Sequence, residues 1–321
     1  MLSHGKPCNN HGQPPKQVVG RFAPSPTGRM HAGNIFAALM SWLIVKAQGG
    51  RIVLRIEDLD VERSKSSYID QIQRDFENLG LTWDEGPYFQ NNRNEAYQAA
   101  FDSLVDRGLV YPCFCTRADL HAASAPHRGE KLVYAGTCRD LSPEDVRTRM
   151  ADRKPSYRLV VPNEVYKLTD RIQGPYEQNL AIDCGDYVIR RSDGLFAYQL
   201  AVVVDDGEQG VNCIVRGMDL LCSTPQQMYM QDLLGYETAQ YAHVPLVVGE
   251  KDRRLSKRDY DAALDELLAA YKTPEAVIGH IAGITGLTPT TEPVSCEELL
   301  ASFDLDALPR LFPDNVQIQW W

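Results

Sequence analysis

The sequence lacks any apolar run long enough to span a lipid bilayer. Even residues 35–47 are interrupted by Ser41 and Lys46, whereas a membrane-spanning helix needs about 20 consecutive apolar residues. The first seventeen residues also lack the apolar core of a signal peptide. We therefore expect residues 1–16 to form a mobile tail and the chain to be a cytoplasmic protein that binds no membrane.

Positive charge is also scarce. The chain carries 33 Lys and Arg residues against 43 Asp and Glu residues, a formal net charge of −10. Because phosphate contacts need local positive charge, this balance speaks mildly against nucleic acid, and we expect no DNA partner. RNA remains open because basic residues gather in two clusters: Arg139, Arg147, Arg149, Arg153, Lys154 and Arg158, and then Lys251, Arg253, Arg254, Lys257 and Arg258. A solvated charged surface explains the first cluster equally well.

Cysteine is too sparse for a disulfide framework, at eight residues in 321. Three of them, Cys113, Cys115 and Cys138, lie close together in the sequence, and three thiolates are a good start for a tetrahedral zinc site. General zinc chemistry favours His121 or His127 as the fourth ligand. The alternative is that Cys113 and Cys115 merely alternate on a half-buried strand, which leaves Cys138 unexplained.

The most informative feature is the motif Arg21-Phe-Ala-Pro-Ser-Pro-Thr-Gly28, which is followed by His31-Ala-Gly-Asn34. A strand-like segment, residues 17–20, precedes the motif, and a helix-like apolar pattern follows it to Gln48. Such a strand–loop–helix joint directs free backbone N–H groups and the positive end of a helix at an anion. The motif therefore predicts a phosphate site, and a triphosphate would suit it.

Two side chains would add to this site. His31 supplies a donor at the helix start, and Lys257 supplies an ammonium group from the charged loop Arg254-Leu-Ser-Lys-Arg258. Either feature alone is more often a helix cap or a solvated loop. Together with the Pro-Ser-Pro-Thr-Gly turn, they indicate a nucleotide site that forms adenylates.

Alternating strand and helix patterns predict an α/β fold. Residues 51–57 alternate as a second strand, and Ser67 is expected to cap a helix that Gly80 ends. A further helix is expected over residues 95–107. The order strand, helix, strand, helix is typical of a parallel sheet.

The pattern changes after Tyr111. Short segments with turn residues run to about residue 185 and indicate an insertion. Residues 186–191 and 195–204 then predict a β-hairpin around a Ser-Asp-Gly turn, and residues 211–215 predict a buried strand.

The rest of the chain is expected to be mainly helical. Thr224 is expected to cap a helix that Gly235 ends, with Gln227 closing a capping box. One last short strand is expected over residues 245–248. The helix-like segments beyond it are residues 262–271, 274–284 and 296–303.

Three motifs carry a family resemblance. The segments His31–Asn34 and Arg254–Arg258 resemble the two signatures of class I aminoacyl-tRNA synthetases, and Arg55-Ile-Glu-Asp-Leu-Asp60 matches their glutamyl branch. The similarity runs over about residues 18–260. It implies an α/β class I synthetase fold: a Rossmann-like parallel sheet, an inserted zinc-containing subdomain and a short C-terminal helical region.

The resemblance also implies domain boundaries. The two halves of the catalytic domain would be residues 17–110 and 186–259, the second carrying the lysine-containing signature loop. Residues 111–185 would be the inserted zinc-binding and acceptor-contacting subdomain, and residues 260–321 the helical region.

Length indicates which member of the branch the chain resembles. Glutamyl-tRNA synthetases that charge a tRNA 3′ end carry a helical anticodon-binding region, for which the segment after Lys257 leaves no room. The chain therefore resembles the glutamyl-Q tRNA(Asp) synthetases. That resemblance implies glutamate, ATP and tRNA(Asp) carrying queuosine as partners, and we expect a monomer.

The resemblance assigns roles to individual residues. Arg21 and Arg216 suit carboxylates because guanidinium groups bind them bidentately, and Glu57 would pair an ammonium group, although each could singly be structural. The implied catalytic residues are His31 and Lys257. The implied glutamate-binding residues are Arg21, Ala23, Ser25, Glu57, Tyr198 and Arg216. The implied ATP-binding residues are Arg21, Phe22, Ala23, Pro24, Ser25, His31, Gly33, Asn34 and Lys257.

Two metal ions are expected. Mg²⁺ would accompany ATP and be held largely by phosphates and water. Zn²⁺ would be structural and bound by Cys113, Cys115, Cys138 and, by resemblance, Tyr134 in place of a histidine.

The implied reaction has two steps. The glutamate carboxylate attacks the α-phosphorus of ATP without tRNA, giving glutamyl-adenylate and pyrophosphate, and the glutamyl group then passes to the queuosine base of tRNA(Asp). One alternative is a truncated glutamyl-tRNA synthetase that charges a tRNA 3′ end. Another is a noncatalytic RNA-binding synthetase paralogue, against which the intact candidate residues speak.

Overall fold

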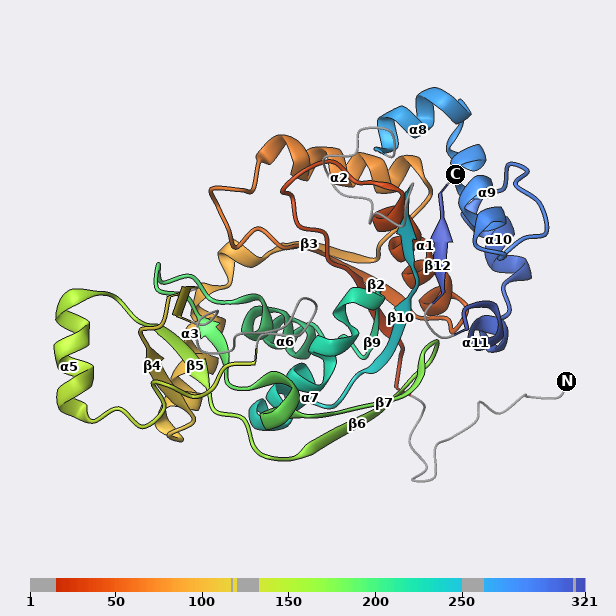
Figure 1. Cartoon of the computed structure of the whole chain (residues 1–321). Coiled ribbons are helices and arrows are strands. Elements are labelled where there is room, and N and C mark those ends of the chain that lie inside the picture. Colours follow the sequence, from red (N-terminus) through yellow and green to blue (C-terminus); the bar gives the residue numbers. More distant parts are fainter. Residues whose placement is uncertain (1–15, 117, 120–132, 250–262, 314–315, 321) are drawn as a thin grey trace, which may run out of the picture.

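The computed structural model describes residues 16–116, 118–119, 133–249, 263–313 and 316–320. Parallel strands form the centre, with helices packed against them, and the C-terminal helices lie at one side of the molecule (Figure 1). Within these described ranges, no helix is both long and apolar enough to cross a membrane.

The N-terminal part forms the predicted parallel sheet. Strands pair in the order β1-β2-β3, and all pairs are parallel. Helix α1 packs closely on β1 at Gly20. A Cβ atom at this position would lie only 2.4 Å from Val45 Cγ2. The elements are β1 (Val19–Phe22), α1 (Ala32–Lys46), β2 (Arg51–Ile56), α2 (Ser66–Asn78), β3 (Glu85–Phe89) and α3 (Asn94–Asp106).

A second parallel pair extends this arrangement on the other side of β1. It consists of β9 (Cys213–Gly217) and β10 (Gln240–Val244). Asn212, just before β9, donates its backbone N–H to the Val19 carbonyl at 3.0 Å. The chain thus proceeds from β1 to β2 in one direction and from β9 to β10 in the other. Ligands of open α/β sheets bind at such a switch point, beyond the carboxyl ends of the strands.

The described part of the predicted insertion contains antiparallel strands, an exposed helix and a short π-helical turn over Leu180–Cys184. Strands β4, β5 and β8 form one antiparallel sheet, and β6 and β7 form a hairpin that reaches toward β10 (Figure 1). The elements are β4 (Val110–Cys113), α5 (Pro143–Asp152), β5 (Ser156–Leu159), β6 (Val165–Asp170), β7 (Gly174–Asn179) and β8 (Tyr187–Arg190).

The hairpin predicted over residues 186–204 is wrong. Its first arm is β8, and its turn is present, but the second arm pairs only through a bridge between Arg190 and Phe196. The chain then enters helix α6 (Tyr198–Glu208). Residues 200–204 read as a strand because valines favour strands, yet all five are buried in the helix. Tertiary burial therefore outweighed local propensity.

Two predicted helix caps are also wrong. Ser67 lies inside α2, whose N-cap is Lys65. Thr224 is the first residue of α7 (Thr224–Leu234) rather than its cap, and its hydroxyl accepts a hydrogen bond from a buried arginine instead of capping the helix. The predicted end of α7 is confirmed, because Gly235 adopts the left-handed conformation with φ 74°.

The C-terminal part contains the predicted helices and one unpredicted strand. The last strand, β12, pairs in parallel with β11 and so returns the chain to the centre. Strand β10 was also absent from the sequence prediction. The elements are β11 (Leu246–Val248), α8 (Leu264–Tyr271), α9 (Pro274–Ile284), α10 (Cys296–Ser302), α11 (Leu308–Leu311) and β12 (Gln317–Gln319).

Candidate functional site

A cavity of about 470 Å³ lies at the switch point between β1 and β9. Its size is typical of small-molecule sites. Every described residue of the predicted glutamate and ATP sets lines it: Arg21, Phe22, Ala23, Pro24, Ser25, His31, Gly33, Asn34, Glu57, Tyr198 and Arg216. The structure thus brings together residues from four separate parts of the sequence, while their ligands remain predictions. Lys257, the other member, lies outside the described residues.

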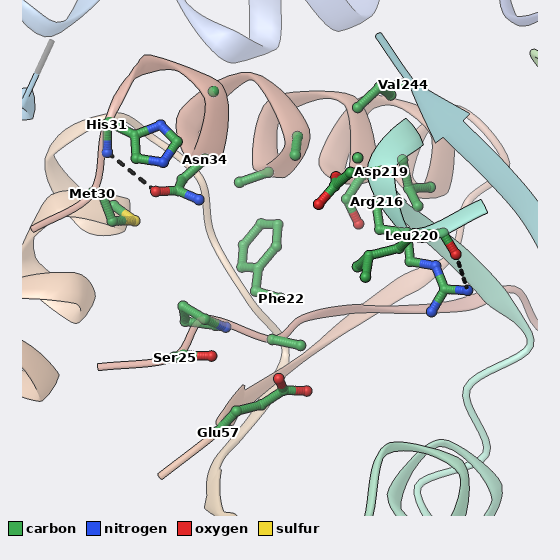
Figure 2. A pocket seen from close by; sticks show the side chains of 18 of the residues that line it. Phe22, Ser25, Met30, His31, Asn34, Glu57, Arg216, Asp219, Leu220 and Val244 are labelled. Atoms are coloured by element: carbon green, nitrogen blue, oxygen red, sulfur yellow. Dashed lines mark hydrogen bonds between the residues drawn. The ribbon is translucent and has the colours of Figure 1, made fainter. Parts of the chain in front are cut away.

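The cavity has two distinct ends (Figure 2). His31 and Asn34 lie at the start of α1 at one end, Arg216 lies at the other, and Glu57 lies on the wall between them. The cavity is therefore long enough for a ligand that contacts the helix start and Arg216 at the same time.

The helix-start end has the predicted strand–loop–helix geometry. His31 is the N-cap residue of α1 with extended backbone, and its N–H donates to Asn34 Oδ1 at 3.2 Å. The first turn of α1 contains no acidic side chain. The positive end of the helix dipole therefore faces the cavity without an opposing carboxylate from that turn, as suits an anion.

Arg21 lies at the end of β1 and is 5% exposed. Its Nη1 donates to the Val215 carbonyl of β9 at 2.9 Å, and its Nε lies 3.5 Å from Asp206 Oδ1. The guanidinium group thus joins the two strands at the switch point and is partly neutralised by an acid of α6.

Glu57 follows β2 directly and is 11% exposed at its side chain. Burial raises its pKa, and repulsion from Asp206 adds to this, although Arg55 and Arg21 pull the pKa down. Arg55 Nη2 donates to Glu57 Oε1 at 3.3 Å. A buried carboxylate with this environment would gain from a cationic ligand group in the cavity.

Arg216 lies on β9 and is also 5% exposed. Unlike Arg21, it has no carboxylate within ion-pair distance among the described residues. Its nitrogens instead donate to neutral acceptors, including Gln227 Oε1 at 2.7 Å and Thr224 Oγ1 at 2.8 Å. A buried guanidinium group without an acidic partner is well suited to a carboxylate ligand.

Sequence reasoning missed several residues of the cavity wall. Asp219 and Leu220, in a short helical turn after β9, line the cavity near Arg216 (Figure 2). Val244 and Val247 line it from β10 and β11. Asp219, Leu220 and Val244 lie at or just beyond the ends of strands, but only the order of the strands in the sheet brings these positions to one cavity.

The cysteine cluster lies in the inserted region, away from this cavity. The Sγ atoms of Cys113, Cys115 and Cys138 all lie within 4.8 Å of one another, and those of Cys115 and Cys138 are 3.6 Å apart. Tetrahedral zinc with Zn–S bonds of about 2.3 Å separates its sulfur ligands by about 3.8 Å. The predicted cysteines therefore have the spacing of a metal site.

Tyr134, the fourth ligand that the resemblance implies, lies beside these three thiols. Its hydroxyl lies 3.5 Å from Cys113 Sγ and 3.9 Å from Cys115 Sγ, and it accepts the Cys138 backbone N–H at 2.8 Å. The two alternative ligands, His121 and His127, lie outside the described residues.

The charge environment of the cluster suits a cation. Burial opposes ionisation of Cys113, but its hydrogen bonds with Tyr134 and Arg158 outweigh it and lower the pKa of this thiol. Burial and the neighbouring Cys113 raise the pKa of Cys115 to about 12. The cluster thus favours one thiolate and resists a second, whereas a divalent cation would stabilise all three.

Two arginines of the first basic cluster contact other parts of the inserted region, and one of them, Arg158, is buried. Arg158 donates to Cys113 Sγ at 3.2 Å and lies over the Tyr134 ring at 3.7 Å. Arg139 pairs with Asp186 at 2.7 Å. Arg139 is nevertheless exposed, as are the arginines on and beside α5, among them Arg147 and Arg149.

Comparisons with known proteins agree with this geometry. The family model described as tRNA synthetases class I (E and Q), catalytic domain, matches residues 17–312. A glutamyl-Q tRNA(Asp) synthetase of Symbiobacterium thermophilum is 46% identical over 305 residues, which cover 91% of this chain and 94% of the relative. The chain belongs to the glutamyl-Q tRNA(Asp) synthetase family. Another member, from Nitratidesulfovibrio vulgaris, is 40% identical over 313 residues, covering 93% of this chain and 97% of its own.

A solved structure supports the same family fold. The glutamate tRNA ligase of Elizabethkingia meningosepticum, in complex with its amino acid, superposes with a TM-score of 0.78 at 26% identity. The match covers 95% of this chain and 67% of that ligase. This glutamyl-Q synthetase family member therefore has the predicted class I α/β fold.

Proposed function

We propose that the protein uses ATP to activate glutamate as glutamyl-adenylate without tRNA, and then transfers the glutamyl group to the queuosine base of tRNA(Asp). The observation that carries the proposal is that Arg216 and Glu57 line the same cavity as the start of α1. A buried cationic group and a buried carboxylate suit a zwitterionic amino acid, and the helix start suits a phosphate.

The two ends of the cavity define how the substrates would lie. The side-chain carboxylate of glutamate would bind Arg216, and its ammonium group would bind Glu57. Its α-carboxylate would then point toward His31, where the α-phosphate of ATP lies in the proposed complex. Arg21, Ala23, Ser25 and Tyr198 would complete the glutamate site.

Activation in this arrangement needs no protein nucleophile. The α-carboxylate oxygen attacks the α-phosphorus, and pyrophosphate leaves. Catalysis would come from positioning and from donors that meet the developing charge, supplied by His31 and Lys257. Phe22, Pro24, Gly33 and Asn34 would contact the nucleotide, and Mg²⁺ would be held mainly by its phosphates.

The transfer step carries the acceptor specificity. The relatives named glutamyl-Q tRNA(Asp) synthetases support the queuosine base as acceptor. We propose that residues 111–185 contact the RNA and that residues 17–110 and 186–259 form the catalytic domain of a monomer, with residues 260–321 packed beside it.

We further propose that Cys113, Cys115, Cys138 and Tyr134 bind a structural zinc ion. The four side chains supply three sulfurs and one oxygen in one cluster, which leaves no open coordination position for catalysis. Purified protein should contain about one zinc per chain by atomic absorption. The Cys138→Ser variant should lose zinc and melt at a lower temperature, whereas Cys184→Ser should keep the native zinc content and melting temperature. Equal zinc content in the two variants would contradict the site.

The function is tested by ATP–pyrophosphate exchange. We expect exchange with glutamate alone, whereas exchange that begins only when tRNA is added would indicate a synthetase that charges a 3′ end. The Lys257→Ala variant should lose exchange while keeping its circular dichroism spectrum.

A second assay tests the acceptor. Radiolabelled glutamate should be transferred to tRNA(Asp) that carries queuosine and not to the same tRNA without the modification. Equal transfer to both would reject the queuosine base as acceptor while leaving glutamate activation intact.

A further inference from the structure

A buried chain of three side chains ends at Arg216. Arg216 Nε donates to His243 Nε2 at 3.0 Å, and His243 Nδ1 lies 2.6 Å from Asp170 Oδ2. The side chains of Asp170 and His243 are fully buried. None of the motifs in the sequence included Asp170 or His243, and neither residue lines the cavity.

The environment of Asp170 keeps it ionised. Its Oδ1 accepts backbone N–H groups from Ile172 at 3.0 Å, Gln173 at 2.9 Å and His243 at 3.1 Å. Burial raises the pKa of Asp170, but the bonds from His243 and these amides outweigh it, and the net pKa lies below its usual value. A carboxylate that accepts several N–H groups is strongly favoured in its charged form.

This ionised group fixes the proton of His243. Burial lowers the pKa of His243, and the positive charge of Arg216 adds to this, against the opposing effect of Asp170. A neutral imidazole carries one proton, and the carboxylate of Asp170 requires it on Nδ1. Nε2 is then an acceptor, as the Nε–H group of Arg216 requires.

The five N–H donors of Arg216 fall into two groups, those with short hydrogen bonds and those with long contacts. Three have short partners: His243 through Nε, Gln227 through Nη1 and Thr224 through Nη2. The others have long contacts, at 3.5 Å to Tyr198 Oη from Nη1 and 3.4 Å to the Leu220 carbonyl from Nη2. One weakly engaged donor thus remains on each terminal nitrogen, which is the pattern that a bidentate carboxylate requires.

We propose that Asp170 and His243 are positioning residues that hold the Arg216 fork in the orientation that selects a carboxylate side chain over an amide. This inference rests on the proposed function, since it takes glutamate as the ligand of Arg216. Because Asp170 lies in the inserted region, this role would make the position of that region matter for the selection of the amino acid.

The inserted region reaches Arg216 through the β6–β7 hairpin. Asp170 is the last residue of β6, and the turn after it docks on β10. Arg171 N–H donates to the Tyr241 carbonyl at 2.9 Å, and Gln173 Nε2 donates to the His243 carbonyl at 2.7 Å. The hairpin therefore holds both the backbone and the imidazole of His243.

The decisive variant is Asp170→Asn. The amide oxygen can keep the three backbone bonds, while its NH₂ group faces His243 Nδ1 and forces the ring proton to Nε2. An N–H group then opposes the Nε–H of Arg216 and displaces the guanidinium group. We expect KM for glutamate to rise about 10- to 100-fold with kcat changed by less than about threefold, because uniform binding is lost. The preference for glutamate over glutamine should fall by the same factor, and KM for ATP should stay unchanged.

Variants of His243 separate orientation from packing. In His243→Gln the amide oxygen can replace Nε2 as acceptor for Arg216, so we expect most glutamate affinity to remain. His243→Met fills similar space without an acceptor and should lose affinity as Asp170→Asn does.

A control and a direct measurement complete the test. Lys167→Met removes an exposed ion pair with Glu177 on the same hairpin and should leave glutamate selection unchanged. Nitrogen-15 NMR of the imidazole should detect the proton on Nδ1 in the native protein and on Nε2 in Asp170→Asn.

The outcomes separate this inference from the proposed function. An unchanged glutamate-to-glutamine preference in Asp170→Asn and His243→Met, or a native proton on Nε2, would overturn the positioning role. Absence of exchange in the native protein would instead reject the proposed function. Calorimetric binding of glutamate to the same variants would then decide the positioning role without catalysis.

Discussion

Arg21 and Arg216 reach one cavity from neighbouring strands, but their charges are balanced in different ways. Arg21 lies beside Asp206, which also accepts a hydrogen bond from the fully buried Arg55 at 2.8 Å. Arg216 is surrounded by a neutral imidazole, an amide and a hydroxyl. The charge of the first arginine is partly balanced by the protein itself, whereas the described residues supply no acidic partner for the second.

The acidic residues near Arg21 belong to an ion-pair network that extends well beyond the cavity. Asp205 is fully buried, pairs with Arg93 at 2.5 Å and lies 3.6 Å from Arg55, and it accepts the Tyr97 hydroxyl. Burial alone would lower the pKa of Arg55, but Asp206, Glu57 and Asp205 outweigh it and raise the pKa above its usual value. This network thus pairs acidic with basic side chains beneath the site, whereas no such ion pair involves Arg216 among the described residues.

The largest effect is expected from Arg216→Gln. The variant removes a cation that has no acidic partner in the described part of the chain, and we expect kcat/KM for glutamate to fall about 100- to 1,000-fold, as for a truncated buried charge pair. Pyrophosphate exchange measures this loss, and the circular dichroism spectrum should stay native. Arg216→Lys keeps the positive charge but lacks the forked guanidinium group, so its kcat/KM for glutamate should lie between those of Arg216→Gln and the native protein. Activity of Arg216→Gln within about threefold of the native protein would remove Arg216 from the glutamate site.

The next effect should fall on stability. Asp205→Asn leaves Arg55 and Arg93 with less compensation, and we expect the free energy of unfolding to drop by about 3 kcal/mol. Urea denaturation measures the drop, and KM for glutamate in the folded variant should change much less than in Arg216→Gln. A native urea midpoint would show that Asp205 does not stabilise the fold in this way.

The smallest effect concerns the pH dependence of Glu57. Its raised pKa means that the folded protein holds a proton that the unfolded chain releases near its ordinary pKa of about 4.3, so ionisation costs stability as pH rises through that window. An ammonium ligand favours the ionised form, so KM for glutamate should fall as pH rises through the same window. Glu57→Gln should raise KM about tenfold and remove this dependence. A pH profile of KM that is identical in the variant and the native protein would assign the titration elsewhere.

The sequence predicted best what is local. The motif from Arg21 to Gly28 lies on one strand–loop–helix joint, so neighbouring residues already determine how its backbone faces a ligand. Glu57, Tyr198 and Arg216 were assigned through family resemblance. Their proximity depends on the order of β2, α6 and β9, which periodicity does not specify, and the segment of Tyr198 was itself predicted as a strand.

The contacts that the sequence did not predict are between residues far apart in the chain. Asp170 and His243 are 73 positions apart and meet only because the β6–β7 hairpin lies against β10. A lone histidine in an apolar strand gives no local signal of its partner. Thr224 shows the same limit, because its hydroxyl had a plausible local role as a cap and serves Arg216 instead.

Strand β12 has a practical consequence for work on this molecule. It pairs along β11, and the Trp320 N–H donates to the Val248 carbonyl at 3.0 Å, just before the segment that carries Lys257. Deleting residues from Gln317 onward would leave one edge of β11 unpaired next to that segment. Affinity tags and fluorescent reporters are therefore better fused ahead of Lys16 than behind β12.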